Sequence, residues 1–373
     1  MRYVLSSLKG AVERNMRIAY IINTFEGGGA ALPIPAIVDV CQGQGHEVHV
    51  AGLIRRNGRA VPAMDSAGIT SDVLAADVAS SPQILHELDR WVGRVRPTHI
   101  WTSLTRATVL GQMVGARQGI PVVSWQHNAF LKPANLALLR LLKKRSRLWI
   151  GDSDFVTELT RKRLGLADSE LACWPIFRTR PDIQPASPWI PGEEIRIGTL
   201  GRLHTAKGYD ILCRALVLLR TVRDLPPFRV MIGGEGADYP VLRDFCARHD
   251  LKNVQFMGYV EDTAAFLRSC HLYVQPSRRE GFCIAAHEAM NTGLPVLASN
   301  VGEMNHSVQD GMTGWKIRPQ RPQELADALA IALRHPERLA AMGQAGRDLV
   351  MQRFSPAAFA RAGKAILQRM ETL

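Results

Sequence analysis

Short runs of β-branched and aromatic residues alternate with longer amphipathic stretches along the first half of the chain. The runs predict strands at residues 18–22, 48–53, 98–103, 122–125 and 148–152. The stretches between them predict helices near residues 30–44, 83–94, 107–118, 134–144 and 153–164. This alternation is typical of a parallel sheet covered by helices.

A proline-rich segment divides the pattern in two. Five prolines lie between Pro175 and Pro191, and proline at that density continues neither a helix nor a central strand. The alternation then resumes with six strand-like runs: IRIGTLG, FRVMIGG, NVQFMG, HLYVQPS, PVLAS and GWKI. A last helix is predicted over residues 356–370, after the cap signal Ser355.

Length and pattern together predict two domains, since roughly 100–200 residues form an average domain. We expect an N-terminal Rossmann-like domain over residues 1–180, a linker over 181–194 and a second Rossmann-like domain over 195–354. Residues 355–373 are expected to pack back on the first domain. The predicted fold class is α/β, with two doubly wound domains and a ligand cleft between them.

The composition, with 46% hydrophobic and 21% charged residues, is typical of a soluble globular protein. The six cysteines form no C-x-x-C pair, which disfavours a zinc site or disulfide framework and favours a reducing compartment. No apolar run approaches the roughly 20 residues that span a bilayer. The first 15 residues lack the marks of a signal peptide, so a cytoplasmic location is expected.

The net charge of +12 is unevenly distributed. Residues 1–150 contain 18 Lys and Arg but 9 Asp and Glu, which suggests an anionic partner. Residues 134–149 combine leucines at helical spacing with five basic residues. The leucines could pack on the sheet, or the helix could rest on anionic lipid or a phosphorylated lipid acceptor at the membrane's inner face. Nucleic acid is not predicted as a partner, because no motif interleaves aromatic and basic residues.

Two cations follow the first strand of the second half. In GRLHTAKGYD, residues 201–210, Arg202 and Lys207 lie between a strand's carboxyl end and a helix. There a diphosphate would meet both cations and free helix N–H groups. The alternative is that both are solvated surface charges.

Two glycine-rich turns follow strands without forming a dinucleotide fingerprint. A G-x-G-x-x-G count from Gly234 reaches Tyr239, and a count from Gly27 reaches Leu32. A nicotinamide or flavin enzyme is therefore disfavoured.

The stretch EGFCIAAHEAM, residues 280–290, places Glu280 in a loop at the N-terminus of a predicted helix and Glu288 two turns inside it. The amides of Phe282, Cys283 and Ile284 are unpaired in that first turn. These groups could bind a hydroxylated ligand. Alternatively, Glu280 complements the helix dipole and Glu288 faces solvent.

The order of these motifs resembles the C-terminal domain of retaining GT-B glycosyltransferases of the large family four. The resemblance extends from residue 195 to about 315. It rests on GRLHTAKGYD, GGEG (233–236), NVQFMG (253–258), YVQPS (273–277), EGFCIAAHEAM, GLPVLAS (293–299) and DGMTG (310–314). The first half resembles the family mostly in architecture.

The resemblance implies a nucleotide-sugar donor held in an interdomain cleft without a metal. It implies roles for Arg202 and Lys207 on the diphosphate and for Glu280 on the sugar, helped by the amides of the helix start. It further implies donor-binding roles for Glu288 on the ribose, Tyr259 and Val260 on the base, and Gly28, Gly29 and Gly234 in the phosphate turns. His127 matches a histidine at the family's cleft edge, although a histidine after a strand is often only structural.

Two positions depart from the family pattern. Cys283 stands where glycine is commoner, which narrows the space beside the sugar. His306 occupies a position where glutamate is usual, so no role is assigned to it.

The sequence thus predicts a retaining, metal-independent transferase with no cofactor. It would move a hexose-type sugar from a UDP donor, favoured over GDP, to a glycan or lipid-linked acceptor. Synthesis of cell-envelope polysaccharide or lipopolysaccharide is the expected setting. The alternatives are a nucleotide-sugar epimerase or hydrolase of the same fold, and a non-catalytic nucleotide-sugar-binding protein.

Overall fold

The computed structural model describes residues 15–127 and 130–373. The prediction that the first 15 residues form no signal peptide concerns a segment whose residues 1–14 lie outside the described part. Two compact units are distinguished. Unit 1 comprises the described residues up to Trp125 together with Leu141–Leu148 and Gly363–Leu373, and unit 2 comprises Gln126–Arg140 and Trp149–Ala362.

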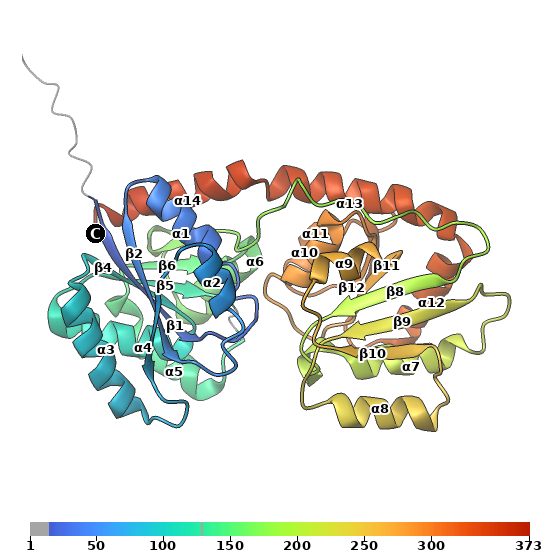
Figure 1. Cartoon of the computed structure of the whole chain (residues 1–373), viewed down its shortest axis with the longest axis horizontal. Helices are drawn as coiled ribbons and strands as arrows, with labels where there is room; N and C mark the ends of the chain where they lie inside the picture. Colours follow the sequence, from blue (N-terminus) through green and yellow to red (C-terminus); the bar gives the residue numbers. More distant parts are fainter. Residues whose placement is uncertain (1–14, 128–129) are drawn as a thin grey trace, which may run out of the picture. The chain divides into compact units, whose positions relative to one another are not determined.

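The first sheet has seven parallel strands in the order β3-β2-β1-β4-β5-β6-β7 (Figure 1). Its strands are β1 (Arg17–Thr24), β2 (Glu47–Ile54), β3 (Ser71–Ala75), β4 (His99–Ser103), β5 (Val122–Gln126), β6 (Leu148–Gly151) and β7 (Leu171–Cys173). The helices among them are α1 (Ile34–Gly43), α2 (Val61–Ser66), α3 (Ser81–Val95), α4 (Thr105–Gln118), α5 (Pro133–Leu142), α6 (Asp154–Leu164) and the 3₁₀ turns η1 (Lys143–Arg145) and η2 (Asp168–Glu170).

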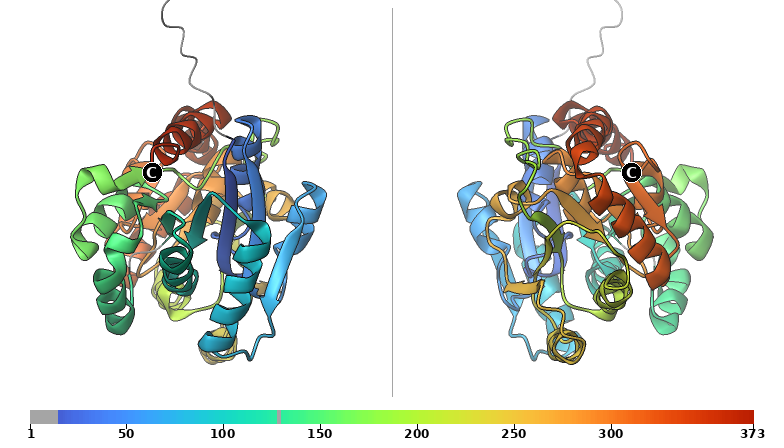
Figure 2. Two further views of the ribbon diagram at one scale, coloured as in Figure 1. Left: turned by 90° about the vertical axis from the view of Figure 1, so that its left-hand side faces the viewer. Right: turned by 90° about the vertical axis from the view of Figure 1, so that its right-hand side faces the viewer.

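Helices α3 and α4 pack together against β1, β2 and β4 (Figure 2). Helix α3 begins at a capping box in which Ser80 and Gln83 satisfy each other's backbone N–H groups. Its side chains Leu88, Trp91 and Val92 are buried in this core. Amphipathic packing of this kind, more than helix propensity, fixes such helices in place.

The sequence predicts five of these strands and five of the α-helices within a few residues. It misses α2, β3 and β7, because β3 is a mostly uncovered edge strand with polar positions and the other two elements are very short. The helix predicted from residue 30 begins only at Ile34. The amides of Ala31 and Leu32 instead bond the Gly28 carbonyl oxygen in a turn.

The second sheet has six parallel strands in the order β10-β9-β8-β11-β12-β13. All six were predicted. They are β8 (Ile195–Leu200), β9 (Phe228–Gly233), β10 (Val254–Gly258), β11 (Leu272–Gln275), β12 (Val296–Ser299) and β13 (Gly314–Ile317). The strand order reverses beside β8, so β8 and β11 flank the point where such sheets bind ligands.

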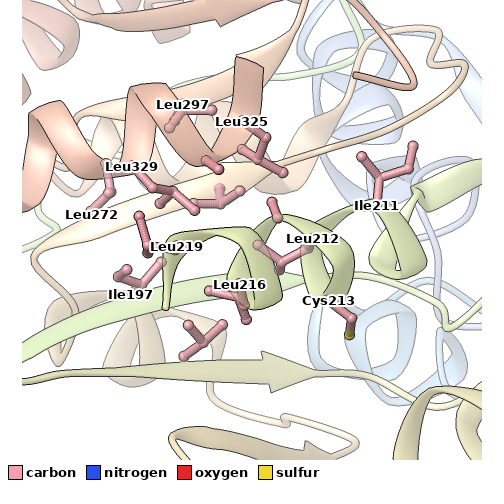
Figure 3. Close-up of a cluster of buried hydrophobic side chains, with 14 of the residues drawn as sticks. Ile197, Ile211, Leu212, Cys213, Leu216, Leu219, Leu272, Leu297, Leu325 and Leu329 are labelled. Atoms are coloured by element: carbon pink, nitrogen blue, oxygen red, sulfur yellow. The ribbon is translucent and has the colours of Figure 1, made fainter. Parts of the chain in front are cut away.

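Helices cover both faces of this sheet. On one face α7 (Tyr209–Leu219) and α12 (Pro322–Arg334) pack together over β8, β11 and β12 (Figure 3). On the other, α10 (Ile284–Asn291) contacts β11, β12, α9 (Thr263–Arg268) and α13 (Leu339–Arg353). The remaining elements are α8 (Tyr239–Arg248), α11 (Met304–Ser307), η3 (Thr205–Lys207) and η4 (Pro336–Arg338). Strands covered on both faces carry near-continuous apolar runs, which explains why the sequence predicts all six strands of this sheet.

The last helix, α14, spans Pro356–Met370 as predicted. In unit 1 its final carbonyl, that of Met370, lies 3.0 Å from Nε2 of His99. The boundaries 1–180, 181–194, 195–354 and 355–373 stay a prediction. No helix within the described ranges has the length and apolar character needed to cross a bilayer.

Candidate functional site

The loop after β8 presents the two predicted cations differently. Arg202 is exposed and makes no hydrogen bond or ion pair with any residue that the structure describes. Lys207 ends η3, and its side chain is only 25% exposed. The Arg202 guanidinium is thus available to a ligand, whereas the Lys207 ammonium is largely buried in the protein.

Glycine lets three loops at the carboxyl edge of this sheet touch backbone to backbone. A Cβ on Gly208, whose φ is +70°, would lie 2.0 Å from the Pro276 carbonyl oxygen. A Cβ on Gly234 would lie 1.9 Å from the Gly201 carbonyl oxygen. The loops after β8 and β9 therefore pack backbone against backbone at Gly201 and Gly234. The loop after β8 packs in the same way against the loop after β11 at Gly208, and a larger residue at Gly208 or Gly234 would clash.

These contacts place Lys207 on Glu280. The Nζ atom of Lys207 donates to Oε1 of Glu280 at 2.8 Å, and the Glu280 side chain is 9% exposed. Burial acts to lower the pKa of Lys207, but the charge and hydrogen bond of Glu280 prevail and hold that pKa above its ordinary value. Lys207 is therefore a fixed positive charge at this edge of the sheet.

Three side chains on one side of β11 and its extension support Glu280. The Ser277 hydroxyl donates to Glu280 Oε1 at 2.6 Å, and Gln275 Nε2 donates to the same oxygen at 3.2 Å and to Ser277 Oγ at 2.7 Å. The Tyr273 hydroxyl donates to Gln275 Oε1 at 2.9 Å and accepts from the Leu200 amide at 3.1 Å. A buried chain of hydrogen bonds thus connects the end of β8 to Glu280.

A second ion pair ties the same two loops together. Arg278 donates to both carboxylate oxygens of Asp210, at 2.6 and 2.7 Å, and to the Thr205 carbonyl at 2.8 Å. Its amide also bonds the Ala206 carbonyl oxygen at 2.8 Å. A bidentate pair of this kind fixes direction as well as distance, so Arg278 holds the η3 turn against the β11 loop.

The helix α10 begins at a strained residue. Cys283 is its N-cap and has φ +67°, the left-handed region that favours glycine. Burial and the neighbouring Glu280 raise the pKa of its thiol, so the sulfur is protonated. The amides of Phe282, Cys283 and Ile284 donate no hydrogen bond within the described part of the chain, which leaves them available to an anion or hydroxyl at the helix start.

Glu288 is half-buried on α10, so the solvent-facing alternative is wrong. Burial raises the pKa of its carboxyl to about 7, against the opposing charge of Arg180. The Arg180 backbone is held nearby, because its amide donates to Oδ1 of Asn291 at 2.7 Å. A poorly solvated carboxylate is costly unless it is hydrogen-bonded, so hydrogen-bond donors of a ligand would stabilise Glu288.

His127 lies within unit 2 beside a buried carboxylate. Its Nδ1 is 3.6 Å from Oδ2 of Asp152. Burial raises the pKa of Asp152 to about 6, with His127 opposing the shift and Glu303 adding to it. The His127 carbonyl oxygen also lies 2.4 Å from where a Cβ on Gly281 would stand, so this residue adjoins the loop that contains Glu280.

The other predicted residues occupy loops at the ends of strands. Gly28 and Gly29 lie in the turn after β1 in unit 1, and Gly234 follows β9. Tyr259 is exposed after β10, and Val260 packs against Gly233. The donor-binding roles of these residues stay predictions.

Sequence reasoning missed the residues that hold the site together: Asp210, Tyr273, Gln275, Ser277 and Arg278. The sequence holds a signal for Tyr273, Gln275 and Ser277, because residues two positions apart along a strand point to the same face of the sheet. The pairing of Arg278 with Asp210 had no local signal. Among residues 15–127 and 130–373, no group of three or more His, Cys, Asp or Glu is placed to hold a metal ion.

Known proteins share parts of this chain's sequence and its fold. The family described as glycosyl transferases group 1 matches residues 182–349, which contain the whole network. This part of the chain belongs to that family. A D-inositol 3-phosphate glycosyltransferase from Nocardia farcinica is 34% identical over 276 residues, covering 66% of this chain and 60% of the relative.

Two solved structures share the GT-B fold of this chain. Anabaena Alr3699/HepE in complex with UDP-glucose matches with a TM-score of 0.83 at 19% identity, covering 96% of this chain and 100% of that one. The apo form of the lipopolysaccharide outer core galactosyltransferase WaaB matches with a TM-score of 0.74 at 14% identity, covering 95% and 100%. The chain spans 41% to 45% of the first curated relatives that it matches.

We expect Gly208→Ala to destabilise the second sheet's domain by about 2–4 kcal/mol, because the methyl group would strike the Pro276 carbonyl and φ is positive. Gly311→Ala is the matched control, since φ is +73° and no atom lies within 4 Å. It should cost only about 1–2 kcal/mol. Thermal unfolding measures both, and equal losses would contradict the interlocking of the loops.

We expect Glu288→Gln to stabilise the protein in a pH-dependent way. A pKa near 7 in the folded state, above the ordinary value of 4.5, means that the carboxyl's contribution to stability is lost as pH rises through 7. The variant's advantage should be small at pH 4.5 and reach about 1–3 kcal/mol at pH 8.5. Melting temperatures at both values test this, with exposed Glu337→Gln as control; a pH-independent advantage would refute it.

Proposed function

We propose that this protein is a retaining, metal-independent glycosyltransferase that moves a hexose-type sugar from a UDP donor to a glycan or lipid-linked acceptor. The observation that carries the proposal is the Lys207–Glu280 pair at the strand-order reversal. The UDP-glucose named for HepE favours uridine over guanosine. The activity named for WaaB is consistent with cell-envelope polysaccharide or lipopolysaccharide synthesis.

Each part of the donor has a proposed set of partners. Arg202 and Lys207 meet the diphosphate, which gains negative charge as its bond to the sugar breaks. Preorganised cations stabilise such developing charge without reorganising solvent. Glu280 and the amides at the start of α10 hold the sugar, with His127 at its edge.

The remaining contacts orient the nucleotide. Glu288 accepts hydrogen bonds from the ribose hydroxyls, and its poor solvation makes those bonds worth more. Backbone groups near Tyr259 and Val260 meet the base. Gly234 allows backbone to approach the phosphates, and the same role for Gly28 and Gly29 in the turn after β1 stays a prediction. The acceptor hydroxyl oxygen then bonds the sugar carbon on the face from which the diphosphate departs, and the hydroxyl proton passes to the departing UDP.

We expect Lys207→Ala to lower kcat by about 10²–10³ at saturating donor, by analogy with a lost oxyanion donor. Lys207→Ala also leaves the buried Glu280 without its cation, so this variant could lose stability as well as activity. Arg202→Ala separates the two effects. Arg202 makes no bond within the described residues, so its loss should reduce kcat without moving the melting temperature. UDP release measures turnover, exposed Lys252→Ala is the control, and full activity in both site variants would refute the proposal.

We expect UDP and UDP-hexoses to raise the melting temperature more than their GDP counterparts. A ligand at 100 times its Kd adds about 2.7 kcal/mol to stability. Stabilisation by GDP-sugars alone would correct the base assignment. Donor breakdown that needs no acceptor would identify the hydrolase or epimerase alternative, and binding without turnover on a broad acceptor panel would identify a silent binding protein.

We further propose that helix α5 brings the protein to an anionic membrane surface at its cytoplasmic face. Leu139 is buried, but Leu138 is 40% and Leu141 80% exposed, so the leucines do not all pack on the sheet. Residues 131–151 contain six Lys and Arg and no Asp or Glu. Of these cations Arg140 lies on α5, and Lys143, Lys144 and Arg145 lie in the adjoining η1. Exposed leucines next to basic residues are typical of interfacial binding.

We expect vesicles containing phosphatidylglycerol to bind the protein, and phosphatidylcholine vesicles not to bind it. Changing Leu138 and Leu141 to Ser together should weaken binding several-fold by removing buried apolar area. Salt should weaken it further, since screening acts on exposed charges. Val78→Ser, at an exposed valine away from the basic segment, is the control for sedimentation with vesicles. Equal binding by all proteins would reject the surface.

A further inference from the structure

The Glu280 carboxylate is occupied on one side. Its Oε1 accepts from Lys207, Ser277 and Gln275 at 2.8, 2.6 and 3.2 Å. None of these three donors bonds Oε2, and the buried Cys283 thiol also lies against the carboxylate. The Glu280 side chain is 9% exposed, and Oε2 is the oxygen that Lys207, Ser277 and Gln275 leave for a ligand.

Ser277 decides which oxygen is occupied. A serine hydroxyl has one hydrogen to donate, and here it goes to Glu280 Oε1 while Gln275 Nε2 donates to the serine oxygen. A turned Gln275 amide would place its own oxygen against Oε1 of Glu280, where Nε2 now donates at 3.2 Å, and would lose the hydrogen bond that its Oε1 accepts from Tyr273. The two neutral donors therefore fix the carboxylate's rotation. Without them, no hydrogen bond from β11 or its extension opposes a rotation that turns both carboxylate oxygens toward the Lys207 ammonium.

We propose that Ser277 is a positioning residue that reserves Oε2 of Glu280 for a single hydroxyl of the donor sugar, and thereby sets donor specificity. The inference rests on the proposed function. A hydrogen bond to a charged group is worth about 1.5–3 kcal/mol. A donor that lacks the matching hydroxyl should therefore react about 10–100-fold less well, since a site built to bind a hydroxyl rejects the analogue without it.

The test compares kcat/KM for UDP-glucose with that for each UDP-monodeoxyglucose. The wild-type protein should disfavour one deoxy donor by about 10–100-fold. Ser277→Ala should shrink that ratio to about threefold or less, mainly through slower reaction of UDP-glucose. Ser277→Thr keeps the hydroxyl and should restore the ratio. Gln275→Leu removes the other neutral donor and should narrow the same ratio, which provides a second variant.

Ser299→Ala is the matched control. Ser299 is also buried, ends the neighbouring strand β12, and its hydroxyl has no partner within the described residues. It should behave as wild type. A purely structural role for Ser277 would lower all donors equally and leave the ratio unchanged, which would overturn the inference.

Stabilisation by UDP alone, measured on each variant, separates this inference from the proposed function. If UDP stabilises wild type and Ser277→Ala alike while the deoxy ratio does not change, the inference fails and the function stands. If neither UDP nor any UDP-sugar stabilises the wild-type protein, and no UDP-sugar reacts with it, the proposed function fails. The inference about Ser277 then fails as well.

Discussion

The ion pair between Lys207 and Glu280 is the interaction on which the candidate site depends. The two residues come from loops 73 positions apart, and each would be costly to bury alone. Removing one partner of such a pair leaves an uncompensated charge, which typically costs about 3–5 kcal/mol. The hydrogen bonds from Ser277 and Gln275 reduce that burden on the carboxylate, so the pair is maintained as part of a network rather than as an isolated contact.

Close backbone packing is what brings the pair together. Gly208 and Gly234 have no Cβ where a Cβ would strike the carbonyl oxygens of Pro276 and Gly201, and the Arg278–Asp210 pair then holds these loops in register. The rigid sheet below fixes where each loop begins. An ammonium placed this way needs little rearrangement when a diphosphate arrives, and preorganisation of this sort is how fixed charges contribute to catalysis.

The sequence predicts the second sheet better than the first for a physical reason. Strands such as β8 and β11 are covered on both faces, so their apolar runs are continuous and easily recognised. Strand β3 has one neighbour and exposed positions at Asp72 and Val73, so its pattern resembles a loop. The motifs also place Arg202, Lys207 and Glu280 at strand ends. That Lys207 contacts Glu280 could not be predicted, because this follows from the order of β8 and β11 in the sheet.

Cys283 shows how a departure from the family pattern acts through the backbone. The position requires φ near +67° so that α10 can begin directly after the loop, and a residue with a Cβ pays roughly 1–2 kcal/mol there that glycine does not. Its thiol is buried near Glu280 and Lys207, so it fills space beside the ion pair itself. Any effect of Cys283 on which sugar fits would therefore pass through the position of Glu280. The glutamate's orientation, set by Ser277 on one side and bounded by this thiol on the other, becomes the variable through which the site could distinguish one hexose from another.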